Sequence, residues 1–128
     1  PVAVDPATLP RYYDPYGSTG GTLTQQARSY LHTNCAQCHR PGGPTPVDFD
    51  FRYSTSLAAT NACDVVPQDA LGIPNARIVA PGNADASVIV ARMNRRDQDA
   101  MPPLGSTVID TDGVTLVTQW INSLANCS

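Results

Sequence analysis

A pair of cysteines followed directly by a histidine is the feature that most constrains this chain, because it gathers three reactive side chains within five residues. The stretch NCAQCHRPGGP, residues 34–44, carries Cys35, Cys38 and His39 and then breaks into glycine and proline. Four chemistries use a C-x-x-C pair: a redox-active disulfide, a structural zinc site, an iron–sulfur cluster and covalent attachment of haem. The remaining sequence has to discriminate among them.

Three of these chemistries need residues that the sequence does not offer near the pair. Zinc and iron–sulfur sites take further cysteines or histidines in close groups, whereas Cys63 and Cys127 each stand alone. A thioredoxin-like pair belongs to a βαβ pattern, and none surrounds Cys35. C-x-x-C-H is the attachment signal for c-type haem, in which each thiol adds across one haem vinyl group and the imidazole lies under the iron. The motif therefore favours covalent haem, and a structural zinc module is kept as an alternative.

A second iron ligand is predicted at Met101, which opens the stretch MPPLG, residues 101–105. The following prolines lower the entropy lost when this loop is ordered, so a methionine there can be held over one haem face. Met93 lies within a predicted helix and is interpreted as core. His32 lies on the helix that carries the cysteines, on the wrong side to become the second ligand.

The pattern of apolar residues predicts helices separated by long loops. Residues 1–21 are interpreted as a linker or wrapping arm and residues 22–128 as one domain. Residues 47–53 alternate as a short strand or a loop lying on the core would. The predicted fold class is mainly α, with long Pro/Gly-rich loops. Three helices are predicted: one capped by Thr22 or Thr24 and running to about residue 34, one capped by Asn83 or Asp85 and running to residue 96, and one from about residue 111 to residue 127.

Charge and hydropathy exclude two classes of partner. All eight basic residues are arginine and all eleven acidic residues are aspartate, for a net charge of −3. The absence of a basic cluster argues against nucleic-acid binding. No apolar run approaches the roughly 20 residues that cross a bilayer, so membrane insertion is not expected.

The combination of CAQCH after an amphipathic helix, MPPLG about 60 residues later and a final helix bearing Trp120 resembles a class I mono-haem cytochrome c domain. Over residues 22–128 the resemblance implies a cytochrome c-like helical fold around one covalent haem c. It also implies that Cys35 and Cys38 hold the haem, with His39 as the proximal and Met101 as the distal iron ligand.

The family's architecture implies two further contacts. Its first and last helices cross at small and aromatic residues, and Ala27, Tyr30, Leu116 and Trp120 are the candidates here. A proline carbonyl after the motif accepts the ring N–H of the proximal histidine in family members. The candidates for that proline are Pro44 and Pro46.

A narrower similarity concerns CAQCHRPGG, FDFRYST, ARIVAPG and MPPLG. These stretches are similar to C-terminal cytochrome modules of secreted bacterial proteins, among them quinone-dependent sugar dehydrogenases and multi-modular carbohydrate-active proteins. The similarity implies a monomeric, periplasmic or secreted module that exchanges electrons with a partner redox protein or neighbouring domain. No constellation for hydrolysis is present, so electron transfer rather than catalysis is expected.

Four further residues receive predicted roles, and two of them, Cys63 and Cys127, depart from the plain family pattern. If haem takes Cys35 and Cys38, two cysteines remain, Cys63 and Cys127, in a compartment that must be oxidising. A disulfide between them is therefore expected, and it would hold the central loops against the C-terminus. Arg77 and Arg92 are candidates to bind the haem propionates.

The sequence suggests where a redox partner binds, and it leaves one alternative function open. The loop around Pro102, Pro103 and Leu104 is interpreted as a small, weakly charged docking face for the redox partner. The alternative function is a haem-based gas sensor or peroxidase-like enzyme in which Met101 leaves the iron easily.

Overall fold

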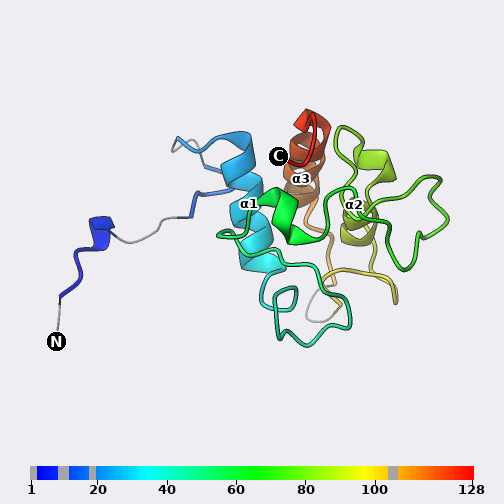
Figure 1. Ribbon diagram of the computed structural model, residues 1–128, viewed down its shortest axis with the longest axis horizontal. Helices are drawn as coiled ribbons and strands as arrows, with labels where there is room; N and C mark the ends of the chain where they lie inside the picture. The colour runs from blue at the N-terminus through cyan, green and yellow to red at the C-terminus, as the bar shows by residue number, and fades with distance from the viewer. Residues whose placement is uncertain (1–2, 9–11, 18–19, 104–106) are drawn as a thin grey trace.

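Loops form most of the computed structural model, which describes residues 3–8, 12–17, 20–103 and 107–128 (Figure 1). Within these ranges the extended pairings are the isolated parallel bridges Cys63–Val79 and Arg77–Ser87. The helical elements follow in chain order: η1 (Pro6–Thr8), α1 (Leu23–Asn34), η2 (Leu57–Thr60), η3 (Ala84–Ala86), α2 (Val88–Met93) and α3 (Thr111–Ser123).

The prediction of a mainly α-helical, cytochrome c-like fold is wrong. The described residues contain α-helices of only 12, 6 and 13 residues, and residues 41–56 and 61–83 have none. Proline and glycine recur through these two stretches, and both residue types are unfavourable in helix interiors. The chain is thus a small helical core with extensive loops.

The core forms where α1 packs against α3. A capping box begins α1, because the Thr22 hydroxyl accepts from the Gln25 N–H while the Gln25 side chain accepts from the Thr22 N–H. The predicted contact set Ala27, Tyr30, Leu116 and Trp120 is buried, and Trp120 is fully inaccessible. The expectation that these side chains are buried where the first and last helices meet is therefore confirmed.

The second predicted helix is shorter than expected at both ends. It was expected to be capped by Asn83 or Asp85 and to run to residue 96, but α2 spans Val88–Met93. Ser87 is extended (φ −95°, ψ 112°), and its hydroxyl donates to the Asn83 carbonyl and accepts from the Ala80 N–H. The pairing of Ser87 with Arg77 therefore interrupts the helix, and the preceding turn becomes η3.

Gly113 marks the closest approach of the α3 N-terminus to α1. A Cβ added there would lie 2.3 Å from the Tyr30 hydroxyl oxygen, which is held by a hydrogen bond to Asp110. Gly113→Ala is expected to destabilise the fold by roughly 1–2 kcal/mol, because overpacking outweighs the gain in helix propensity of about 1 kcal/mol. Chemical denaturation measures the loss. Thr115→Ala, exposed two residues later, is the control, and equal stability of the two variants would contradict the predicted clash.

Hydrogen bonds of buried polar side chains hold the loops in place. Arg28 on α1 is only 7% exposed, and its guanidinium donates to the carbonyls of Arg52 and Thr55. The Asp50 carboxylate accepts from the Arg52 guanidinium at 2.8 Å and from the Thr55 hydroxyl at 2.7 Å. The Arg52 hydrogen bonds keep the pKa of Asp50 well below its usual range. Residues 47–53 are thus a loop on the core, with Phe51 buried.

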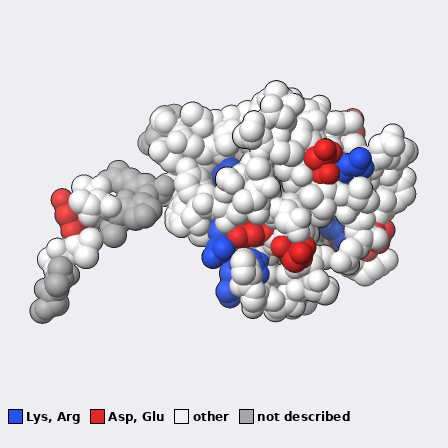
Figure 2. Space-filling view, viewed as in Figure 1, with Lys and Arg blue, Asp and Glu red and all other residues white. Residues whose placement is uncertain are grey.

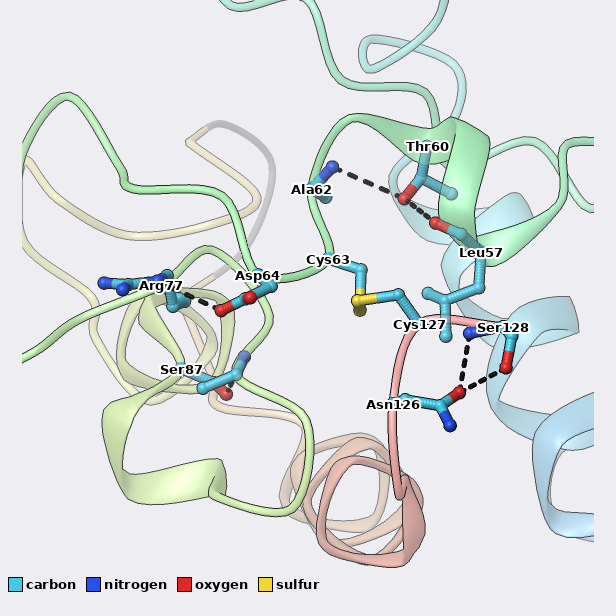
Figure 3. Close-up of a disulfide and its surroundings, with 11 residues drawn as sticks. Leu57, Thr60, Ala62, Cys63, Asp64, Arg77, Ser87, Asn126, Cys127 and Ser128 are labelled. Atoms are coloured by element: carbon cyan, nitrogen blue, oxygen red, sulfur yellow. Dashed lines mark hydrogen bonds and ion pairs between the residues drawn. A yellow bond between two sulfur atoms is a disulfide. The ribbon is translucent and has the colours of Figure 1, made fainter.

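The predicted disulfide between Cys63 and Cys127 is confirmed. The two Cα atoms lie 5.8 Å apart, and the bond joins residues 64 positions apart in sequence. Figure 3 shows it linking the segment after η2 to the chain end beyond α3. It therefore holds the central loops against the C-terminus, and α3 ends at Ser123 rather than at residue 127 as predicted.

Part of the predicted arm contacts the domain. The Tyr13 N–H donates to the Ser29 hydroxyl, and the Gln26 side chain donates to the Gly17 carbonyl. Residues 3–8, with η1, lie away from the helices (Figure 1), and residues 1–2, 9–11 and 18–19 of the predicted arm lie outside the described residues. None of the described helices is both long and apolar enough to cross a membrane.

Candidate functional site

The cysteine–histidine motif forms a tight turn at the end of α1. The Cys35 N–H still bonds to Leu31, and the His39 N–H donates to the Cys35 carbonyl at 2.8 Å. Beyond the motif, a Cβ at Gly43 would lie 2.1 Å from the Cys38 carbonyl oxygen. The glycine of the Gly/Pro break therefore allows the chain to fold back onto the motif.

A cavity of about 720 Å³ opens beside this turn. Cys35, Cys38 and His39 line it, and so does Met101 from the distant loop after α2. Its volume falls within the roughly 300–1,000 Å³ typical of small-molecule and cofactor sites. Its apolar wall includes Phe49, which the residue 47–53 loop supplies. The structure thus brings together all four residues predicted to hold the cofactor.

His39 combines burial with an unused ring nitrogen. It is 8% exposed, and its ring stacks on Phe49 with centroids 4.2 Å apart. Its carbonyl accepts from the Phe51 N–H at 2.9 Å, which fixes the backbone. Burial lowers the pKa of His39, so its ring is neutral at neutral pH. Its buried Nδ1 has no hydrogen-bond partner among the described residues. A neutral imidazole can bind a metal through one ring nitrogen while the other donates a hydrogen bond.

The predicted proline partner does not bind His39 in this structure. Nδ1 bonds to neither Pro44 nor Pro46, although Pro46 lines the cavity. His32 is not a cavity residue. Its Nδ1 accepts from the Tyr53 N–H, and its ring stacks on Tyr12 with centroids 4.4 Å apart.

Both motif cysteines are free, half-buried thiols. Burial, with a smaller effect of the neighbouring Cys38, raises the pKa of Cys35 to about 12. Cysteines that exchange disulfides have a lowered pKa, so this environment does not favour redox exchange. The described ranges hold no group of three or more His, Cys, Asp or Glu side chains able to bind a metal ion, which a structural zinc site requires.

Met101 is half-buried, and its main chain is bonded to the end of α2. Its N–H donates to the Arg92 carbonyl at 3.0 Å, and its carbonyl accepts from the Arg96 guanidinium at 3.2 Å. Met93 also lines the cavity, but it is buried within the hydrophobic core, as the sequence predicted.

The two candidate arginines differ in position. Arg92 lines the cavity and donates to the Asp99 carbonyl at 3.2 Å. Arg77 is not among the lining residues, and its guanidinium bonds to the Asp64 carboxylate at 3.1 Å. Arg96, which sequence reasoning missed, lines the cavity four residues after Arg92, beyond the end of α2. The i, i+4 spacing of the two arginines on the helix predicted to residue 96 was the available signal.

A second feature missed from the sequence is a carboxylate shared by two tyrosines. Tyr30 and Asp110 line the cavity, and the phenols of Tyr30 and Tyr16 both donate to Asp110 Oδ2 at 2.9 Å. Asp110 also caps α3 by accepting from the Gly113 N–H. That backbone hydrogen bond, with smaller contributions from the phenols, lowers the pKa of Asp110. The hydrogen bond from Tyr16 to Asp110 thus connects the arm to the cavity wall, although the two residues lie 94 positions apart in sequence.

The chain finds no match among family models, curated proteins or solved structures. Any functional conclusion therefore depends on the residues of the cavity.

Proposed function

We propose that this chain holds one haem c through Cys35 and Cys38 and transfers single electrons, with His39 and Met101 as the iron ligands. The observation that supports this most is that one cavity of about 720 Å³ is lined by all four residues. The burial of the His39 ring, stacked on Phe49 in the wall of this cavity, is a second indication that the site fits such a group.

Each residue has a defined chemical role in this proposal. The Cys35 and Cys38 thiols each add S–H across one vinyl C=C, which forms a thioether without net oxidation. His39 provides a neutral imidazole and Met101 a thioether, and this ligand pair favours a high reduction potential. When bound, the haem iron supplies a reversible one-electron change. Phe49 and the other apolar lining residues limit access of water, and Arg92 is the predicted donor to a propionate.

The expected partner is a redox protein or neighbouring domain in the periplasm or outside the cell. The Cys63–Cys127 disulfide is compatible with such an oxidising compartment. Most of the surface seen in Figure 2 carries neither Arg nor Asp. Pro102 and Pro103 are exposed beside the cavity, whereas Leu104 of the predicted docking face lies outside the described residues. Transient redox contacts generally bury less than about 1,200 Å².

An absorption spectrum of the oxidised and reduced protein, with carbon monoxide added to the reduced form, tests the proposal. We expect a c-type spectrum, a weak sulfur-to-iron charge-transfer band in the oxidised protein and no reaction with carbon monoxide. A c-type spectrum with ready carbon monoxide binding would instead favour the gas sensor or peroxidase-like function. A colourless protein from cells that mature c-type haem would refute both.

Met101→Ala is expected to abolish the sulfur-to-iron band and to open the iron to carbon monoxide. The reason is that alanine removes the only thioether that we assign to the iron. Met93→Leu is the control, since a volume-conserving change in the core costs less than about 1.5 kcal/mol and leaves the ligand in place. Loss of the band in Met93→Leu but not in Met101→Ala would reassign the ligand to Met93.

A further inference from the structure

Arg96 connects the cavity wall to the loop that carries Met101. A single guanidinium nitrogen, Nη2, donates to the Met93 carbonyl at 2.9 Å and to the Met101 carbonyl at 3.2 Å. Met93 is the last residue of α2, and Arg96 itself lines the cavity. The side chain therefore joins the C-terminal end of α2 to the Met101 backbone.

The backbone around Met101 has limited means of holding itself in place. The Met101 N–H is used in the bond to the Arg92 carbonyl, and Pro102 and Pro103 have no N–H to donate. The Arg92 carbonyl holds the N–H of Met101, so the Met101 carbonyl is the group through which a side chain can hold the C-terminal side of this residue. A hydrogen bond from a charged donor is roughly twice as strong as a neutral one.

We propose that Arg96 is a positioning residue that keeps Met101 in the wall of the cavity, so that its thioether remains available to the iron. This inference rests on the proposed function, because it assigns a cause to the His39 and Met101 ligation. The guanidinium suits the task because its planar group presents several donors in a fixed arrangement and its charge is permanent.

Arg95 provides a matched control on the neighbouring position. Its guanidinium bonds to the carboxylate of Asp97 at 2.8 Å and lies 3.3 Å from that of Asp99, and its side chain is 36% exposed. It does not line the cavity. Removing its charge changes the net charge as much as removing that of Arg96, but leaves the Met101 carbonyl bonded.

The test compares Arg96→Gln with Arg95→Gln in the haem-loaded protein. In Arg96→Gln we expect the c-type spectrum to remain, because the thioethers are untouched. We expect the sulfur-to-iron band to weaken and the reduced protein, unlike the wild type, to bind carbon monoxide. Arg95→Gln is expected to match the wild type. Arg96→Lys, which keeps a charged donor, is expected to restore most of the band. Arg96→Leu retains part of the aliphatic stem, adds no sulfur to the cavity and replaces Arg96→Gln if that variant does not fold.

The outcomes separate this inference from the proposed function. If the wild type shows the band, and Arg96→Gln or Arg96→Leu keeps it unchanged and does not bind carbon monoxide, the role of Arg96 alone is overturned. Equal effects of Arg95→Gln and Arg96→Gln also overturn it, because the cause is then net charge. A wild type that lacks the band and binds carbon monoxide overturns the His39 and Met101 ligation, and the role of Arg96 with it.

Discussion

Replacing Cys35 and Cys38 together with alanine is expected to abolish covalent haem attachment in cells that mature c-type haem proteins. Both thiols line the cavity that also contains His39, and thioether formation consumes one thiol for each vinyl group. Without thiols, haem is held by coordination alone and acidified organic solvent extracts it. The intact mass of the denatured protein measures the effect directly: the wild type carries the mass of one haem and the variant does not.

The other cysteine pair supplies the control for this experiment. Cys63→Ser combined with Cys127→Ser removes the same number of sulfur atoms. Cys63 and Cys127 are joined to each other by a disulfide, and neither lines the cavity. That variant is expected to keep its covalent haem. Haem retained after denaturation of the Cys35→Ala/Cys38→Ala variant would show that other groups attach it, and the proposed function would then lose its chemical basis.

The site was predictable from sequence where its residues are close together or chemically distinctive. Cys35, Cys38 and His39 form a local motif, and Met101 was identified because the two prolines after it lower the entropy lost when its loop is ordered. The structure places these four residues around one cavity. The disulfide followed from a count of four cysteines, of which the motif accounts for two.

The remaining features depend on contacts that a one-dimensional pattern does not contain. Asn83 and Asp85 were both plausible caps for the second helix, but the pairing of Ser87 with Arg77 decides where α2 begins. Asp110 was not distinguishable from the other aspartates until the fold placed Tyr16 and Tyr30 beside it. The fold class was wrong because a resemblance carried by short motifs does not determine the conformation of the long segments between them.

Arg96 and the disulfide illustrate two ways in which a loop-rich chain can hold a site. Arg96 fixes a single residue by a hydrogen bond to its backbone. The disulfide acts at longer range: Val65 and Val66, which follow Cys63 closely, line the cavity, so the cross-link restrains the segment that forms part of its wall. Few secondary-structure hydrogen bonds hold these loops, and we therefore expect the disulfide to contribute strongly to stability.

Replacing Cys63 and Cys127 with serine is expected to lower the free energy of unfolding by roughly 4 kcal/mol. The bond closes a loop between residues 64 positions apart, and chain entropy predicts a stabilisation of about this size. Both positions are half-buried, so the serine hydroxyls reach solvent and add little desolvation cost. Denaturant unfolding of the haem-loaded protein, followed by circular dichroism, measures the loss.

Reduction of the wild-type protein separates the cross-link from the substitution, because the reduced protein keeps both sulfur atoms and loses only the bond between them. If the restraint on the unfolded chain is the cause, the reduced wild type and the double serine variant unfold at the same denaturant concentration, well below that of the oxidised protein. Reduction is also expected to add two hydrogens to the mass. If the oxidised and reduced wild type unfold together while the serine variant is weaker, the cost lies in local packing of the sulfur atoms, and the central loops are held by contacts such as those of Arg28 and Asp50 instead.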